Sequence, residues 1–189
     1  MLLAPLGIYR CIRPLRPEDI AILQMWDRDP DIRRLTGKKF SGRESVEQWW
    51  GDFLRDPHRI GFAIIDGQGN LIGDIALEQI ARRTREAELR ISIGDKRYWG
   101  RGLGTEAMRA VLEIAFCKMA LAKVYLRVKP QNHRAIRAYL KTGFHKVGRL
   151  LGSGRLKGHG DVILMEIDQQ TYQGWLRADS AGRGLTPVG

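Results

Sequence analysis

Residues 97–107, RYWGRGLGTEA, have the composition of a loop that binds an anion. An extended segment, 87–93, precedes this loop, and a run with helical spacing, 105–116, follows it. Glycines let the backbone wrap a bulky anion with its N–H groups pointing inward, and the loop holds three, Gly100, Gly102 and Gly104. The helix that begins next adds unpaired N–H donors and the positive end of its dipole. The pattern predicts a phosphate-binding loop.

Two common nucleotide motifs do not fit this loop. A Walker loop needs a lysine after its last glycine, and here Thr105 and Glu106 follow Gly104. A dinucleotide fingerprint needs G-x-x-G at its end, and this loop reads G-x-G-x-G. Arg-x-x-Gly-x-Gly between a strand and a helix instead resembles the acyl-CoA-binding loop of the GNAT superfamily of N-acetyltransferases. Taken alone, the loop also fits a strand-to-helix turn without a ligand.

A second motif lies downstream, in residues 123–149. It reads as a strand over 124–128, a break at Pro130 and a short helix from about Asn132 that stops at Gly143. The pattern N-x-x-A-x-x-x-Y-x-x-x-G-F is similar to the second GNAT landmark and is formed by Asn132, Ala135, Tyr139, Gly143 and Phe144. Positions 132, 135 and 139 share one helix face. Considered alone, Asn132 also fits an ordinary helix N-cap, and Tyr139 also fits an aromatic residue that only packs against its neighbours.

The resemblance implies an α/β GNAT fold with a mixed, mostly antiparallel sheet flanked by helices, acetyl-CoA as co-substrate, and no metal. In that family the Asn holds the pantetheine arm and the Tyr is the general acid beside the CoA sulfur, which assigns this role to Tyr139. Many relatives carry Ser where Ala135 stands, so one optional cofactor contact is lost. The residues expected to bind the cofactor are Ile91, Ser92, Ile93, Trp99, Gly100, Arg101, Gly102, Leu103, Gly104, Thr105, Asn132, Arg134 and Ala135.

Acetyl transfer to an amine also needs a base, because alkyl amines with a pKa of about 10.4 are mostly protonated at neutral pH. Glu88, on the strand that enters the loop, is the best-placed carboxylate, although a solvated strand residue beside Arg90 or a water chain to the amine also fits. In that family this strand diverges from its neighbour and leaves backbone donors unpaired. The N–H groups of residues 91–93 would therefore polarise the carbonyl of the acetyl thioester. Neither Cys11 nor Cys117 lies in a motif, so no covalent intermediate is expected.

The chain of 189 residues is expected to form one domain over residues 1–178, followed by a flexible tail over 179–189. There is no CxxC motif, no long apolar run and no signal-peptide pattern, so we expect a cytoplasmic protein without disulfides, zinc or membrane contact. The Ser41-x-x-Glu44 pattern predicts a capping box. The other expected elements are a strand over 7–13, a helix over 16–26, a helix from 46, a hairpin over 61–77, a strand over 161–167 and a helix over 168–177.

The acceptor is less well defined by the sequence. The motifs resemble the branch that contains ribosomal-protein N-terminal, spermidine and some aminoglycoside acetyltransferases. The net charge is +11, and residues 114–160 hold 11 Lys or Arg and no Asp or Glu, a field that repels a polycation and suits RNA-rich partners. Acidic residues that would favour a polyamine gather in the first helical region, at Glu18, Asp19, Asp27, Asp29 and Asp31.

On this balance we expect the acceptor to be a protein or peptide N-terminal amine, such as that of a ribosomal protein. The alternative acceptor is a small amine, either a polyamine or an aminoglycoside. Two alternatives from other classes are a basic nucleic-acid-binding module and an acyl-CoA sensor without turnover. A homodimer is a further expectation from the resemblance.

Overall fold

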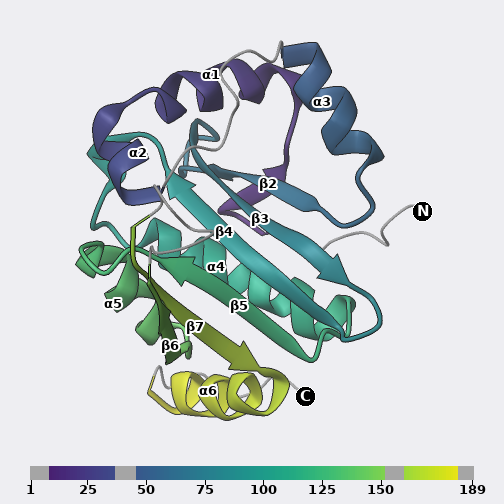
Figure 1. Cartoon of the computed structure of the whole chain (residues 1–189), viewed down its shortest axis with the longest axis vertical. Helices are drawn as coiled ribbons and strands as arrows, with labels where there is room; N and C mark the ends of the chain where they lie inside the picture. The colour runs from purple at the N-terminus through teal and green to yellow at the C-terminus, as the bar shows by residue number, and fades with distance from the viewer. Residues whose placement is uncertain (1–8, 37–45, 152–159, 183–189) are drawn as a thin grey trace.

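The computed structural model describes residues 9–36, 46–151 and 160–182. Within them lies a seven-stranded sheet of order β1-β2-β3-β4-β5-β7-β6 (Figure 1). All neighbours are antiparallel except β4 and β5, which are parallel. The strands are β1 Ile12–Pro14, β2 Ile60–Ile65, β3 Leu71–Ala81, β4 Glu86–Ile93, β5 Lys123–Val128, β6 His145–Leu150 and β7 Val162–Asp168.

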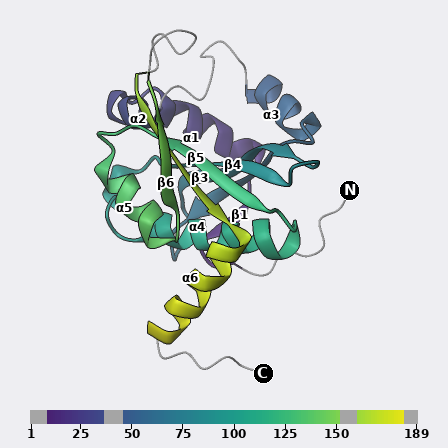
Figure 2. The same ribbon diagram turned by 60° about the horizontal axis from the view of Figure 1, so that its bottom comes forward.

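The helices lie on both faces of this sheet. In the view of Figure 1, α4 passes behind the sheet, while α1, α2 and α3 lie together near the β1–β4 half. Figure 2 shows α6 projecting away from the sheet beyond β7. The helices are α1 Pro17–Asp27, α2 Pro30–Thr36, α3 Val46–Arg55, α4 Leu103–Glu113, α5 His133–Lys141 and α6 Gln169–Gly182; a 3-10 turn covers Lys96–Tyr98, and a π-helical turn, Ile114–Lys118, extends α4.

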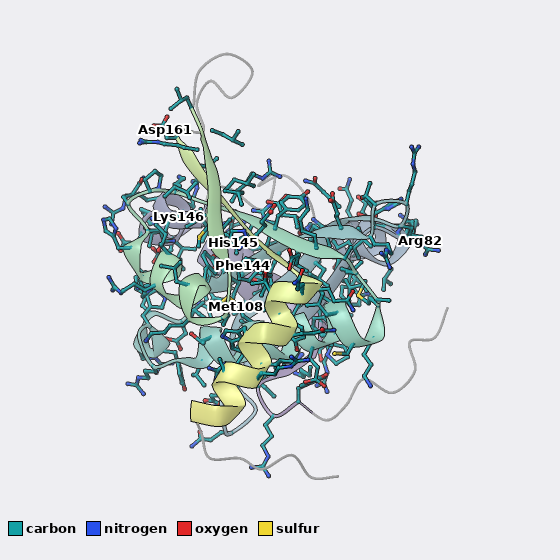
Figure 3. All side chains as sticks on the ribbon, turned by 90° about the horizontal axis from the view of Figure 1, so that it is seen from below. Arg82, Met108, Phe144, His145, Lys146 and Asp161 are labelled. Atoms are coloured by element: carbon teal, nitrogen blue, oxygen red, sulfur yellow. The ribbon has the colours of Figure 1, made fainter. Side chains whose placement is uncertain are left out.

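The two faces of the central strands differ in polarity because side chains alternate along a strand. On one face, Ile75 and Leu77 of β3 lie opposite Ile91 and Leu89 of β4 and join the main core with α4. Figure 3 shows Met108 of α4 within this interior, whereas Arg82 at the β3–β4 turn points away from it. The other face carries charged residues and is partly covered by α1 and α3, whose smaller core includes Leu23, Trp49 and Ala63 of β2.

The sheet opens between β4 and β5. These strands pair only from Glu86 opposite Lys123 to Glu88 opposite Tyr125. Beyond that point β4 stays paired with β3 as far as Ile93, and β5 stays paired with β7 as far as Val128. Figure 1 shows the two strands diverging toward their C-terminal ends. The divergence leaves a gap in the ladder beside the glycine loop, which begins just after β4.

The expected order of elements is confirmed, with three differences. Of the strand expected over 7–13, residues 7 and 8 lie outside the described residues, residues 9–11 are not part of a strand, and β1 begins only at Ile12. Strand β6 was not expected; all its side chains are exposed and it pairs only with β7, at the sheet edge. Helix α6 continues to Gly182, so residues 179–182 of the expected tail belong to it. The expected Ser41–Glu44 capping box lies outside the described residues. No described helix is both long enough and apolar enough to cross a membrane.

Candidate active site

A cavity of about 550 Å³ lies where β4 and β5 diverge. It is lined by the second half of β4, the glycine loop, the start of α4, the end of β5 and the cavity-facing side of α5, with α1 and α2 closing the other side. Of the residues expected in the site, Arg101 and Leu103 do not line it. The others do: Glu88, Ile91, Ser92, Ile93, Trp99, Gly100, Gly102, Gly104, Thr105, Asn132, Arg134, Ala135 and Tyr139. The topology therefore brings both sequence motifs to one cavity.

The glycine loop adopts a backbone that requires glycine. Gly100 and Gly102 have φ of +78° and +85°, and a Cβ at either position would meet no atom within 4 Å. Backbone conformation, not crowding, therefore selects glycine at these two positions. Gly102 is the N-cap of α4, whose first residue is Leu103. The first N–H groups of a helix lack intrahelical acceptors, so the loop and this helix start together offer donors to an anion.

Trp99 and Arg134 form one wall of the cavity. The indole Nε1 of Trp99 donates a hydrogen bond of 2.8 Å to the carbonyl of Ile93, which fixes the ring beside the end of β4. The Arg134 guanidinium lies 3.6 Å from the centre of the Trp99 ring. Burial lowers the pKa of Arg134 from its ordinary value, yet a guanidinium keeps its charge in proteins. Arg134 therefore places a fixed cation in the cavity, as expected for a phosphate partner.

The N–H groups of residues 91–93 do not all face the same way. Gly94 N–H donates to the carbonyl of Ile72 on β3, at 2.9 Å. Because N–H directions alternate along a strand, those of Ile93 and Ile91 point away from β3, into the gap that β5 leaves, and that of Ser92 points toward β3. The Ile93 carbonyl accepts from Trp99 on the same open side, in agreement with this assignment. Ile91 and Ile93 are thus the two donors that can reach a carbonyl in the gap.

Asn132 and Tyr139 both line the cavity from α5. The Asn132 side chain caps the helix by accepting a hydrogen bond of 3.2 Å from the Ala135 N–H. Asn132 is therefore both the helix N-cap and a residue of the cavity lining. Tyr139 is 7% exposed and its ring packs at a tilt against Phe144, with 6.0 Å between ring centres. Burial raises the pKa of Tyr139 to about 12. The phenol therefore keeps its proton at neutral pH and can donate it within the cavity.

Glu88 is buried and ion-paired, so it is not a solvated strand residue. Its Oε1 accepts a hydrogen bond of 3.0 Å from Arg127 Nε, and its Oε2 accepts from a second Arg127 nitrogen. Gln79 Nε2 also donates to Oε2, at 3.1 Å. Both carboxylate oxygens are thus occupied, and a proton taken from an amine must compete with the Arg127 guanidinium. Arg127 was not expected in the site.

Sequence reasoning also missed six other charged residues that line the cavity: Asp74, Glu78, Arg90, Lys129, Arg137 and Lys141. Asp74 lies opposite Ser92, and Glu78 lies opposite Glu88, so all share the polar face of the sheet. Glu78 is paired with Arg59 at 2.9 Å and with Arg90 at 3.5 Å. The available signal was the charge at Glu86, Glu88 and Arg90, at every second position of the strand that enters the glycine loop.

The acidic cluster expected near the acceptor is largely neutralised. Asp19 holds Arg13 through two hydrogen bonds, of 2.7 and 2.8 Å. Lys96 binds Asp29 at 2.9 Å and Asp31 at 2.7 Å. Asp27 is the one member of the cluster that lines the cavity within the part of the chain that the structure describes.

Beside Asp27, the Trp26 ring lies directly over Gly94. A Cβ at Gly94 would be 2.0 Å from that ring, so only glycine allows this approach between α1 and the end of β4. No group of three or more potential metal ligands occurs among the described residues.

Comparison with known proteins agrees with this geometry. The chain is 28% identical over 163 residues to the spermidine N(1)-acetyltransferase of Escherichia coli (strain K12), covering 85% of this chain and 87% of that one. The crystal structure of spermidine N-acetyltransferase from Vibrio cholerae in complex with CoA and spermine superposes with a TM-score of 0.75 at 26% identity, covering 86% of this chain and 96% of the other. A kanamycin resistance protein of Rhizobium radiobacter is 39% identical over 57 residues, 30% of this chain and 53% of that one.

A family model described as "Acetyltransferase (GNAT) domain" matches residues 10–145, which include the glycine loop and the α5 motif. The match confirms the fold expected from those two motifs, as does the superposition above. It also confirms the enzyme class and its co-substrate, acetyl-CoA. The chain belongs to the GNAT family of acetyl-CoA-dependent N-acetyltransferases.

Proposed function

We propose that this enzyme acetylates a primary amine of a polyamine. The proposal rests on the acidic wall of the cavity, which consists of the four carboxylates that line it: Asp74, Glu78, Glu88 and Asp27. The likeness to spermidine acetyltransferases over most of both chains supports the same acceptor class. A polyamine therefore replaces the protein or peptide N-terminus that we expected from the charge balance alone.

The excess of positive charge does not argue against a polycation, because charge is divided between two walls. The cavity cations are Lys129, just after β5, and Arg134, Arg137 and Lys141 of α5. They suit the phosphates of CoA, because α5 contacts α4, the helix that follows the glycine loop. The carboxylates come from β3, β4 and α1 instead. The two arginines of the polar face, Arg90 and Arg127, are paired with Glu78 and Glu88, so four carboxylates of this wall face two cavity-lining guanidinium groups.

Apolar side chains complete the acceptor side of the cavity. The lining of the cavity next to Asp27 includes Leu23 and Trp26 of α1 and Ile32 and Leu35 of α2. A polyamine alternates ammonium groups with short hydrocarbon segments, so it needs carboxylates separated by apolar surface. A free peptide N-terminus carries one ammonium group and a polar backbone, so it would make fewer favourable contacts with such a wall.

The chemistry follows from the residues at the gap. Acetyl-CoA supplies an activated acetyl group as a thioester. The Ile91 and Ile93 N–H groups offer hydrogen bonds to a carbonyl oxygen placed between β4 and β5, which stabilises negative charge there. Tyr139 holds a proton for the departing sulfur. Glu88 anchors the amine side and receives its proton directly or through water.

The test is a panel of acceptors with purified enzyme and saturating acetyl-CoA. Spermidine, spermine, a peptide with a free N-terminus and kanamycin are compared by thiol release and by product mass. We expect kcat/KM for the two polyamines to exceed that for the peptide by at least about tenfold. Preference for the peptide or kanamycin would overturn the proposal.

A matched pair of variants then tests the acidic wall. Asp74→Asn should lower kcat/KM for spermidine by about tenfold and leave the affinity for CoA unchanged. Asp52→Asn, on an exposed side chain of α3 that does not line the cavity, is the control and should change neither value. Equal effects of the two substitutions would contradict a role of the wall in acceptor recognition.

A further inference from the structure

The glycine loop cannot hold its own conformation. Gly100 and Gly102 have no side chains, and both occupy backbone conformations that glycine leaves easily. The loop must therefore be held by the residues that precede it and by the start of α4. The two preceding residues, Tyr98 and Trp99, both line the cavity. Trp99 is fixed to β4 through the Ile93 carbonyl, and Tyr98 is fixed elsewhere.

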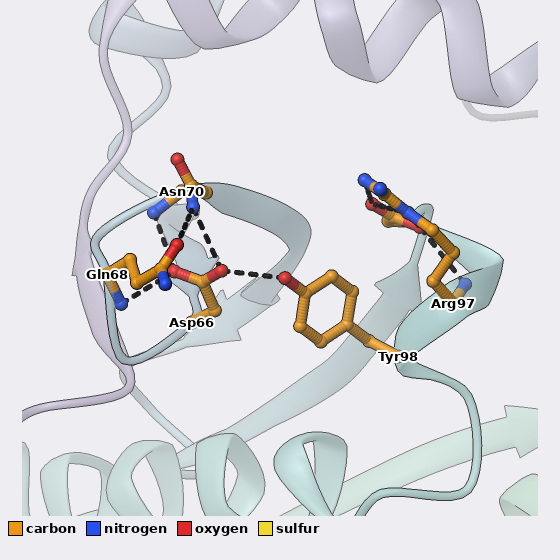
Figure 4. Close-up of polar contacts among 6 residues, drawn as sticks. Asp66, Gln68, Asn70, Arg97 and Tyr98 are labelled. Carbon is orange, nitrogen blue, oxygen red and sulfur yellow. Dashed lines mark hydrogen bonds and ion pairs between the residues drawn. The ribbon is translucent and has the colours of Figure 1, made fainter.

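Tyr98 is tied to the turn between β2 and β3. Its hydroxyl donates a hydrogen bond of 2.7 Å to Asp66 Oδ2, across 32 residues of sequence (Figure 4). Asp66 is buried and also accepts from the backbone N–H groups of Gln68 and Asn70, at 2.9 Å each, and from the Asn70 amide at 3.0 Å. Hydrogen bonds from Asn70, and then from Tyr98, hold the pKa of Asp66 well below its ordinary value. The acceptor of the Tyr98 bond is therefore a fixed, charged carboxylate.

Tyr98 in turn contacts the loop itself. Its backbone carbonyl accepts from the Arg101 N–H at 3.5 Å, and the Arg101 guanidinium lies 5.6 Å from the centre of its ring. The neighbouring Arg97 points away to Asp95, which it binds at 2.6 Å, so it does not share this role (Figure 4). A continuous set of contacts thus runs from the β2–β3 turn through Tyr98 to the middle of the loop.

We propose that Asp66 and Tyr98 are positioning residues for CoA, which hold the glycine loop in its anion-binding conformation before the cofactor arrives. Asp66 does not line the cavity and acts only through Tyr98. When the bond is broken, the loop spends less time in the competent conformation, and the apparent affinity for CoA falls by the same fraction. The chemical step at Tyr139 is not affected.

The experiment is calorimetric titration of CoA into the Tyr98→Phe variant, without any acceptor. We expect binding about fivefold weaker than in the wild type, the same increase in KM for acetyl-CoA, and kcat within about twofold. Tyr172→Phe is the control, because it removes a phenol hydroxyl from a buried residue of α6 that does not line the cavity. It should leave CoA affinity unchanged.

A second substitution changes the acceptor of the same hydrogen bond. Asp66→Asn replaces the charged acceptor by a neutral amide and should also weaken CoA binding. The double variant should bind no more than about twofold more weakly than the weaker single variant, because both substitutions act on the same Tyr98–Asp66 contact. Unchanged CoA affinity in a folded Tyr98→Phe variant would overturn the proposal, and so would losses that multiply fully. Since no acceptor is present, these outcomes are independent of the polyamine proposal.

Discussion

Replacing Tyr139 with Phe tests the catalytic assignment most sharply, because it removes one oxygen and keeps the ring. The ring packs against Phe144 and is 7% exposed, so its contacts with the core survive the change. A positioned general acid contributes about 10²- to 10⁴-fold to a rate. We expect kcat to fall by at least about 10²-fold, equivalent to about 2.7 kcal/mol of barrier at 25 °C. The assay is thiol release from acetyl-CoA with spermidine at saturation.

The Tyr139 hydroxyl should also affect how the free energy of unfolding depends on pH. The pKa of Tyr139 is about 12 in the folded state against 10.0 for the ordinary side chain, so the unfolded chain ionises first as pH rises. This contribution to stability is complete below pH 10 and is lost between about pH 10 and 12. Tyr139→Phe should unfold with a weaker pH dependence in that range, while KM for acetyl-CoA stays within about twofold. A variant with near wild-type kcat would refute the general-acid role.

Two further substitutions probe ion pairs of the fold and site. Arg127→Gln removes the two guanidinium contacts that orient the Glu88 carboxylate, and loss of that orientation should outweigh the loss of competition for its oxygens. We expect kcat/KM for the acceptor to fall about tenfold in steady-state assays while calorimetry finds CoA affinity unchanged, and an unaltered kcat/KM would contradict the orienting role. Asp19→Asn breaks a largely buried pair with Arg13 at the start of α1, and urea unfolding should show a loss of about 3 kcal/mol. Burial alone would raise the pKa of Asp19, but hydrogen bonds from Arg13 and Arg16 outweigh it and lower that pKa. The Asp19 contribution is therefore present above about pH 4 and lost as pH falls, and a variant with the wild-type acid dependence would argue against it.

The sequence predicted the parts of the site that depend on local backbone chemistry. Backbone positions with φ near +80° strongly favour glycine, so the loop at Gly100 and Gly102 could be recognised from the sequence before the fold was known. The spacing of Asn132 and Tyr139 on one helix face is also local. The resemblance to the GNAT superfamily assigned both motifs to one cofactor, which spacing alone could not do.

What the sequence did not reveal depends on pairing between distant segments. Strand β6 has no alternation of apolar and polar residues, because both its faces are exposed, and so it gave no strand signal. Arg127 and Glu88 come from different strands, and their contact follows only from the parallel register of β4 and β5. The neutralising role of Lys96 on Asp29 and Asp31 was hidden for the same reason.

We propose that acetyl-CoA binds in the gap between β4 and β5 against α4 and α5, and that the amine binds against β3, β4 and α1. A crystal structure of the enzyme with CoA and spermine would locate both ligands in one experiment. We expect pyrophosphate oxygens within hydrogen-bond distance of the Gly102 and Gly104 N–H groups, the CoA sulfur beside the Tyr139 hydroxyl, and spermine along Asp74, Glu78 and Asp27. Pyrophosphate bound away from the glycine loop, or spermine bound outside the cavity, would contradict this proposal.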